Sequence, residues 1–298
     1  MTQTHVDLTK YIVVPIWWGC NNDCSLCMLS GIKSKLPLIG FDRYKKVIGD
    51  IVNDGVFENL ILSGAEVTTF GELDEFLQFA ASFRWFKKIQ IQTNGRRLSD
   101  RDYLEHLLDC GANEFFVSIH GIGDIHDAIT QRQGSYRETM EGIRNLEHLH
   151  VNFVTNTVLT RANCDQIPQL MSHLCQTETR EIHLWNFFPM QSKDTRNLVV
   201  PLREVLNLIP EILSRIEPSG KVLVLKAFPH CLPLQGSAVF DGRFPVTILP
   251  DRFWREFSQS MFGLCVYRND CIDRNCWGLS GAYTDKFGDE RATLSPIT

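Results

Sequence analysis

Residues 11–27 read YIVVPIWWGCNNDCSLC, an apolar run that leads directly into three closely spaced cysteines. The run is short and contains β-branched residues, so it predicts a buried strand over Tyr11–Trp17. Cys20, Cys24 and Cys27 follow in the spacing CxxxCxxC. Cysteine thiolates are the usual ligands of iron–sulfur clusters, and three of them can hold three corners of a cubane and leave one iron open. A structural zinc is the alternative, although such sites favour paired CxxC knuckles and four protein ligands.

Beyond this loop, short apolar runs alternate with stretches of helical period. This alternation is typical of βα units around a parallel sheet, and six repeats predict an α/β fold, a partial (β/α)6 TIM-like barrel. The predicted strands are Tyr11–Trp17, Asn59–Leu62, Lys88–Gln92, Glu114–Ile119, Val151–Val158 and Glu181–Phe187. The predicted helices are Phe41–Val52, Leu73–Phe83, Arg101–Leu108, Arg137–His148 and Ile167–Cys175, with an N-cap at Ser99-Asp100.

The second half of the chain predicts two further parts. Residues 191–201 are polar and irregular, and helix Leu202–Ile216 would then close the barrel. A strand at Lys221–Ala227 precedes a tail that is rich in Pro, Gly, aromatic residues and Cys, as in small lobes ordered by metal. We therefore expect a core barrel over 1–190, a linker and closing helix over 191–220, and a small C-terminal cysteine-rich lobe over 221–298.

Charge and cysteine usage exclude several classes of protein. The chain has 30 Lys and Arg against 35 Asp and Glu, with no basic run longer than a pair, so no nucleic-acid partner is expected. The apolar run before the first cysteines is too short for a membrane span and wrong for a signal peptide, so no membrane partner is expected. Ten clustered cysteines indicate metal binding rather than a disulfide framework, with a cytoplasmic location.

CxxxCxxC after the first strand of a βα repeat resembles the signature of the radical S-adenosylmethionine (radical SAM) superfamily. The resemblance implies that Cys20, Cys24 and Cys27 hold a [4Fe–4S] cluster with S-adenosylmethionine at its open iron. It also implies reductive cleavage of that cofactor to methionine and a 5′-deoxyadenosyl radical, which abstracts hydrogen from a substrate. An electron donor such as flavodoxin or ferredoxin would supply the reducing electron.

Other segments resemble those with which the family binds S-adenosylmethionine. Residues 62–67, LSGAEV, look like the Gly-Gly-Glu-Pro segment, although Ala65 and Val67 replace the usual glycine and proline. Leu26 also departs from the family pattern, in which an aromatic residue commonly precedes the last cysteine. Residues 92–95, QTNG, resemble the Thr-Asn-Gly that ends the third strand, and Ser118 resembles the serine that ends the fourth.

These segments all fall at predicted carboxyl ends of strands, where parallel α/β folds collect ligands. The resemblance implies cofactor contacts from Ser63, Gly64, Ala65, Glu66, Thr93, Asn94, Ser118, His120, Arg132, Asn156 and Phe187. For Glu66 the expected contact joins its carboxylate to the amino group of the cofactor. Two alternatives stay open: Arg132 as a solvent-facing loop residue, and His120 as a structural histidine.

Four further cysteines lie in the C-terminal region: Cys231, Cys265, Cys271 and Cys276. Their layout resembles the auxiliary-cluster extensions of radical SAM enzymes and predicts a second [4Fe–4S] cluster. Zinc and unligated thiols are the alternatives, and His230 could replace one ligand in either metal case. Cys110, Cys164 and Cys175 have no companion at ligand spacing and are read as structural.

The expected function is a radical SAM enzyme of oxidoreductase or isomerase type. The barrel with a C-terminal lobe resembles peptide-maturing relatives, which favours hydrogen abstraction from a peptide or peptide-like natural-product precursor, leading to oxidation, a crosslink or epimerisation. The same chemistry on a sugar-like or aminocyclitol metabolite is the second hypothesis. An iron–sulfur or zinc scaffold protein is the non-enzymatic alternative, but it would not need the segments around Glu66, Asn94 and Ser118.

Overall fold

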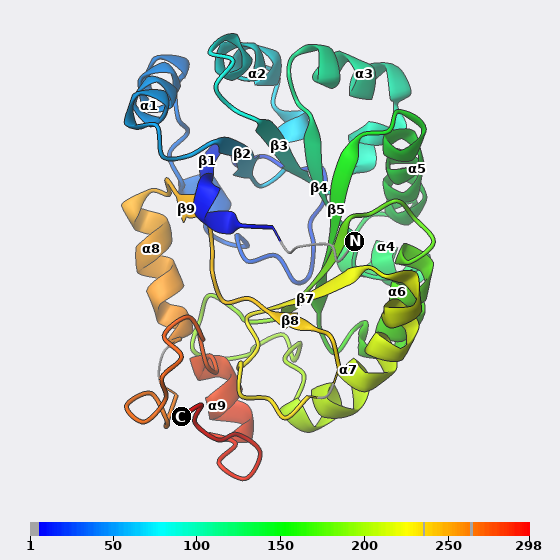
Figure 1. The fold of residues 1–298 in the computed structure, drawn as a ribbon, viewed down its shortest axis with the longest axis vertical. Coiled ribbons are helices and arrows are strands. Elements are labelled where there is room, and N and C mark those ends of the chain that lie inside the picture. Colours follow the sequence, from blue (N-terminus) through cyan, green and yellow to red (C-terminus); the bar gives the residue numbers. More distant parts are fainter. Residues whose placement is uncertain (1–5, 235, 263–264) are drawn as a thin grey trace.

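The computed structural model describes residues 6–234, 236–262 and 265–298. All strands in this part of the chain form one parallel sheet in the order β8-β7-β6-β5-β4-β3-β2-β1-β9 (Figure 1). The sheet curves but does not close, as a partial TIM-like barrel requires. Its strands are β1 (Tyr11–Trp17), β2 (Asn59–Gly64), β3 (Lys88–Thr93), β4 (Glu114–Ser118), β5 (Asn152–Leu159), β6 (Glu181–Asn186), β7 (Val222–Lys226), β8 (Val239–Phe240) and β9 (Val246–Thr247). The predicted fold class is confirmed.

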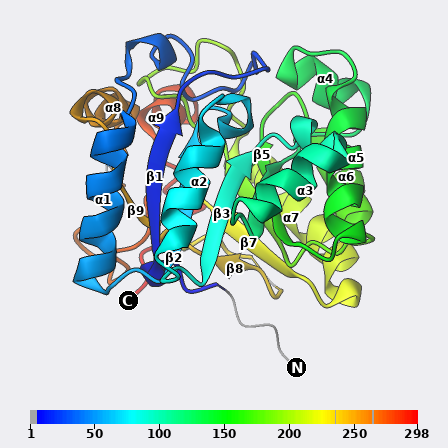
Figure 2. The ribbon, with the colours of Figure 1, turned by 90° about the horizontal axis from the view of Figure 1, so that it is seen from above.

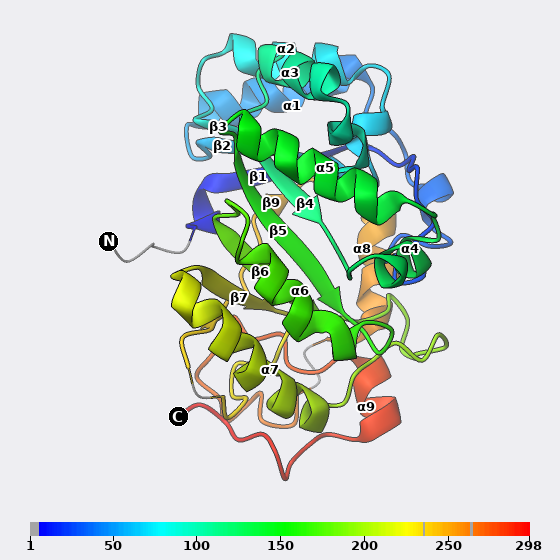
Figure 3. The ribbon, with the colours of Figure 1, turned by 90° about the vertical axis from the view of Figure 1, so that its right-hand side faces the viewer.

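Helices cover the outer face of this sheet (Figures 1 and 2). They are α1 (Phe41–Asp54), α2 (Leu73–Ser82), α3 (Arg101–Asp109), α4 (Asp124–Thr130), α5 (Ser135–His148), α6 (Ile167–Leu174) and α7 (Leu202–Ile216). Figure 3 shows α5, α6 and α7 stacked along one side of the barrel, whereas α8 (Asp251–Phe257) and α9 (Gly281–Phe287) lie on its open side. The Asp100 carboxylate caps α3 by accepting from the Tyr103 N–H, which confirms the predicted N-cap.

Alternation along the strands separates an apolar outside from a partly polar inside. Outward residues such as Ile12, Val14 and Ile16 pack against the helices in the main core. Inward residues from β1 to β7 enclose a cavity of about 70 Å³, whose lining includes Gln90 and Gln92. A mainly apolar cavity with a few polar groups is typical of small-molecule sites, although Gln90 itself is already paired, since its Nε2 donates to Glu114 Oε2 at 2.8 Å.

The last two strands form the two edges of the open sheet, an arrangement that the sequence did not predict. β8 pairs with β7 and β9 pairs with β1, so residues 241–245 cross the gap between the two sheet edges. A buried ion pair of 2.9 Å between Lys226 Nζ and Asp241 Oδ2 anchors this crossing, and both side chains are 2% exposed. The predicted boundary at residue 220 thus lies before three strands of the same sheet, and the domain division stays a prediction. No helix in the described ranges is long and apolar enough to cross a membrane.

Candidate active site at the carboxyl ends of the strands

The loop with the first three cysteines is held in shape by backbone hydrogen bonds from separate elements. Asp23 N donates to Thr130 O at 3.1 Å, and Ser25 N donates to Ile129 O at 2.8 Å, so the end of α4 supports one side. Glu66 N donates to the Gly19 carbonyl at 2.9 Å and supports the other side. The loop conformation is therefore fixed by the protein itself.

The three thiols are half-buried and close enough to interact electrostatically. Burial raises the pKa of Cys24 to about 12, and the charges of Cys27 and Cys20 add to this shift. Burial likewise raises the pKa of Cys20. Thiolates gathered in this way become favourable when they bind metal cations, because coordination requires the deprotonated form.

The spacing of the thiols suits a cluster better than a single ion. Ligands of one tetrahedral zinc, at about 2.3 Å from the metal, lie roughly 4 Å apart. Within the described residues, three candidate ligand atoms approach within 4.8 Å of one another only at Asp74, His106 and Cys110. At least one pair of sulfurs in the N-terminal triad therefore lies more than 4.8 Å apart, which is compatible with each sulfur binding a different iron of a cubane. The donor set fits a [4Fe–4S] cluster.

Gly64 brings the ends of β1 and β2 into contact. Its φ is +144°, and a Cβ atom built on it would lie 1.9 Å from the Trp17 carbonyl oxygen, so a larger residue cannot occupy this position. Ala65 N donates to the same oxygen at 2.8 Å. Ser63, the residue before Gly64, is buried at the end of β2. The 63–66 segment therefore lies directly beside the cysteine loop.

Glu66 is fully buried, and its carboxylate is surrounded by donors from the protein. Oε1 accepts from Thr93 Oγ1 at 2.7 Å and from Thr68 Oγ1 at 2.6 Å, and Oε2 accepts from Asn94 N at 2.6 Å. Burial raises its pKa and these hydrogen bonds oppose that shift. Glu66 thus positions the Thr93–Asn94 turn, and its contact with the cofactor amino group stays a prediction.

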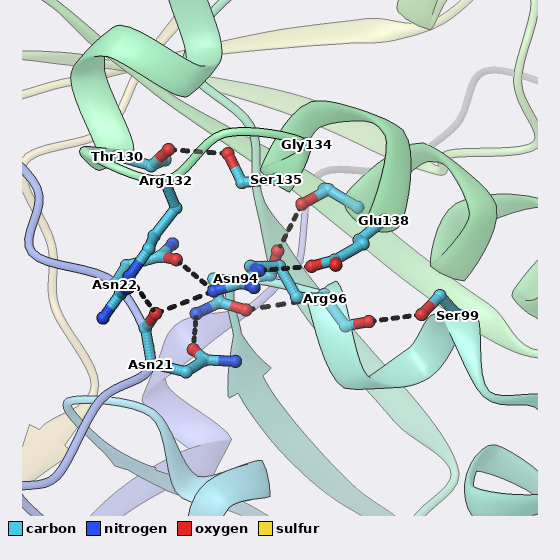
Figure 4. Close-up of polar contacts among 12 residues, drawn as sticks. Asn21, Asn22, Asn94, Arg96, Ser99, Thr130, Arg132, Gly134, Ser135 and Glu138 are labelled. Carbon is cyan, nitrogen blue, oxygen red and sulfur yellow. Dashed lines mark hydrogen bonds and ion pairs between the residues drawn. The ribbon is translucent and has the colours of Figure 1, made fainter.

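Arg132 and Asn94 also reach the cysteine loop (Figure 4). Arg132 Nε donates to the Asn21 carbonyl at 3.1 Å, although the residue is largely exposed. Asn94 Nδ2 donates to Asn21 Oδ1 at 2.7 Å. Arg96 binds the same loop and was missed in the sequence, because a single arginine after Thr-Asn-Gly carries no signal of its partners.

Some buried polar atoms on β5 and β6 have no hydrogen-bond partner among the described residues. Ser118 is paired in register with Asn156 of β5, whose Oδ1 is buried without a hydrogen-bond partner among the described residues. Trp185 Nε1 of β6 is likewise buried and unpartnered within these ranges. Buried polar atoms normally have partners, so these two point to a bound group at this end of the barrel.

His120 and Phe187 have clear structural roles in addition to their predicted ones. His120 is buried, and burial lowers its pKa to about 3, so its imidazole is neutral at pH 7. Its Nδ1 accepts from Val158 N at 3.3 Å. Phe187 is 4% exposed within the main core, with the Arg196 guanidinium 5.9 Å from its ring centre. Their contacts with the cofactor stay predictions.

The C-terminal cysteines are partly gathered. The thiols of Cys231, Cys265 and Cys276 are near enough for their charges to interact, and burial raises the pKa of Cys231 and of Cys276. Cys271 follows in the same loop, where its N–H donates to Tyr267 O. The backbone N–H of His230 donates to Cys276 Sγ at 3.3 Å, and its Nδ1 lies 2.6 Å from Asp273 Oδ2, which orients the ring.

A family model described as Radical SAM superfamily matches residues 14–174, just over half of the chain, and the chain belongs to this superfamily. Members of the family are enzymes that use a [4Fe–4S] cluster and S-adenosylmethionine.

The relatives of the chain are distant. It is 24% identical over 153 residues to the sporulation killing factor maturation protein SkfB of Bacillus subtilis, covering 51% of this chain and 36% of SkfB. It is 22% identical over 207 residues to the PqqA peptide cyclase of Bradyrhizobium diazoefficiens, covering 67% of this chain and 53% of the cyclase. The structure of Streptococcus suis SuiB bound to precursor peptide SuiA superposes with a TM-score of 0.61 at 14% identity, covering 74% of this chain and 49% of SuiB. The chain spans about half or less of the length of these proteins.

Proposed function

We propose that this radical SAM enzyme abstracts a hydrogen atom from a peptide or peptide-like precursor, leading to oxidation, a crosslink or epimerisation. The observation that carries the substrate class is the similarity to SkfB, to PqqA peptide cyclase and to the SuiB complex with its precursor peptide. The unpartnered Trp185 N–H supports it, because the carbonyl of a peptide group can accept this hydrogen bond.

Cys20, Cys24 and Cys27 would hold the cluster. When bound, the cluster and S-adenosylmethionine supply a one-electron cleavage that gives a 5′-deoxyadenosyl radical. The segments 63–66, 93–94 and 118–120, with Arg132, Asn156 and Phe187, would bind and orient the cofactor. Aromatic packing around the loop, such as Trp17 stacked on Phe70 at 4.9 Å, would keep water away from the reacting atoms.

The C-terminal lobe over 221–298 would hold an auxiliary [4Fe–4S] cluster on Cys231, Cys265, Cys271 and Cys276, after the linker and closing helix of 191–220. Such a cluster could accept an electron from the substrate radical, which would make the reaction an oxidation. A small electron donor such as flavodoxin or ferredoxin would reduce the N-terminal cluster. The gathered thiols of Cys231, Cys265 and Cys276 support this assignment.

The test is to measure 5′-deoxyadenosine formation by the anaerobically reconstituted protein with candidate substrates. Peptides encoded beside the gene should raise the rate above the uncoupled level and should acquire a mass change or an altered stereocentre. If these peptides leave the rate unchanged while a sugar-like or aminocyclitol metabolite raises it, the peptide proposal is wrong. Replacing Trp185 by Phe, which removes the N–H donor together with part of the indole ring, should raise the KM for the peptide.

A further inference from the structure

Arg96 joins the end of β3 to the cysteine loop. It is the first residue of the turn Arg96–Ser99 that follows β3, and its side chain is 16% exposed. Nη1 donates to the Asn21 carbonyl at 2.7 Å and to Asn22 Oδ1 at 2.8 Å, and Nε donates to Glu138 Oε2 of α5 at 2.6 Å (Figure 4). The guanidinium is therefore held by α5 while it binds two acceptors inside the CxxxCxxC segment.

These contacts determine how the Asn22 amide is oriented. Arginine can only donate hydrogen bonds, so the Asn22 atom that faces Arg96 must be the oxygen. The Nδ2 group then points away from Arg96, and it is buried without a partner among the described residues. Asn22 is only 4% exposed, so water cannot readily satisfy this donor. A buried N–H normally has an acceptor, and a group bound in the cysteine loop can supply one.

The position of Asn22 indicates which acceptor this is. It lies between Cys20 and Cys24, and its backbone N–H donates to Cys20 Sγ at 3.3 Å. A cluster bound by these cysteines brings inorganic sulfides and thiolates into the same loop, and both accept N–H hydrogen bonds. Hydrogen bonds to the sulfurs of a cluster stabilise its more negative, reduced state and so raise the reduction potential.

We propose that Arg96 is a positioning residue that holds Asn22 so that its side-chain N–H donates to a sulfur of the cluster, which makes the cluster easier to reduce. This inference rests on the proposed cluster site at Cys20, Cys24 and Cys27. A purely structural role for Arg96 in holding the loop would account for its bonds to Asn21 and Asn22, but it would leave the side-chain donor of Asn22 without a partner.

The experiment compares the midpoint potential of the reconstituted full-length protein, without S-adenosylmethionine, across four variants. Asn22→Asp keeps an oxygen facing Arg96 but loses the donor, and Asn22→Leu loses the donor without adding charge. Arg96→Gln removes the guanidinium. Arg97→Gln is the matched control, because Arg97 instead donates to Thr68 O and lies over the Tyr103 ring.

At a fixed donor potential, we expect the first three variants to shift the ratio of reduced to oxidised cluster roughly tenfold toward the oxidised form. This shift corresponds to a midpoint potential that is lower by about 59 mV for one electron. Arg97→Gln should leave the potential unchanged. If Arg96→Gln fails to retain its cluster, the two Asn22 variants still decide the matter. Wild-type potentials in both Asn22 variants would overturn the proposal. If equilibrium dialysis then showed weaker binding of S-adenosylmethionine by these variants, the cofactor would be the acceptor instead. A wild-type protein without a reducible cluster would instead refute the proposed site.

Discussion

The two cysteine regions of the molecule differ in how their shape is maintained. The N-terminal loop over residues 19–27 donates hydrogen bonds to the end of α4 and accepts them from Arg96 and from the segment after β2. Around the C-terminal cysteines, Arg268 N donates to Cys265 O at 3.1 Å, and Cys276 Sγ accepts from Gly278 N and from the distant His230 N, both at 3.3 Å. The first region is organised by the barrel, whereas the second combines contacts within its own loop with a bond from His230.

This difference separates two ways of building a metal site. A loop whose conformation is fixed by the sheet can keep that conformation without metal. Loss of the metal then abolishes catalysis but changes the stability little. A region that depends more on contacts within its own loops gains more of its order from the metal, because binding free energy then becomes folding free energy.

The largest expected effect is on catalysis by the N-terminal triad. Replacing Cys20, Cys24 and Cys27 by Ala should abolish 5′-deoxyadenosine formation, because no cluster remains to donate the electron. The unfolding transition should change little, since the surrounding hydrogen bonds stay in place. Cys175→Ala, on the far side of α6, is the control and should retain activity. Turnover in the triple variant would defeat the assignment.

The second prediction concerns the C-terminal region. With an auxiliary cluster, iron analysis should give about twice the content of one cubane, and the variant that lacks the N-terminal triad should keep iron–sulfur absorption. Cys231→Ala combined with Cys276→Ala should lose half of the iron and make this region sensitive to limited proteolysis. A triad variant that is colourless and free of iron would show that no second cluster exists.

The third prediction concerns the ion pair between Lys226 and Asp241, which anchors the crossing between the two edges of the sheet. Lys226→Met removes the buried partner of Asp241 Oδ2, whereas Arg243 Nε still holds Oδ1 at 3.0 Å, so the free energy of unfolding should fall by about 1–3 kcal/mol. Adding Asp241→Leu should recover much of this loss in chemical denaturation. If the double variant is less stable than the single one, the buried charge is not the cause.

The fourth prediction asks whether Glu66 binds the cofactor in addition to holding the Thr93–Asn94 turn. Glu66→Gln removes a charge-assisted contact and should weaken cofactor binding by roughly 1.5–3 kcal/mol if the contact is buried. Affinity can be measured by equilibrium dialysis, with circular dichroism to check folding. Unchanged affinity in a folded variant would leave Glu66 only its role in holding Thr93 and Asn94.

The smallest effect is a pH dependence from two buried histidines. Burial lowers the pKa of His120 to about 3 and of His126 to about 4, whereas the unfolded value is about 6.5. Below pH 6.5 the unfolded chain binds protons that the folded one does not, so stability falls as the pH falls toward 4. Between pH 6.5 and 5.5 the loss should be roughly 1 kcal/mol per histidine. His126→Asn, which keeps an acceptor for His120 N, should show about half of this slope in denaturant unfolding at the two pH values.

The sequence alone determined the parallel α/β fold and the position of the cysteine loop. The predicted strands and helices agree with β1 to β7 and with α1, α2, α3, α5, α6 and α7 to within two residues at each end. These features can be predicted because hydrophobic period and cysteine spacing are local properties of the chain. The short helices α4, α8 and α9, of seven residues each, gave too few turns to show a period.

Tertiary structure alone decided which distant residues meet. Arg96 and Asn22 are 74 positions apart, and their contact depends on how the end of β3 faces the loop after β1. Cys110 had no companion at ligand spacing in the sequence, yet α2 and α3 place Asp74 and His106 beside it. The crossing at 241–245 likewise exists only because the curved sheet brings its two edges near each other. Such contacts follow from the packing of whole elements, which no local pattern of residue types encodes.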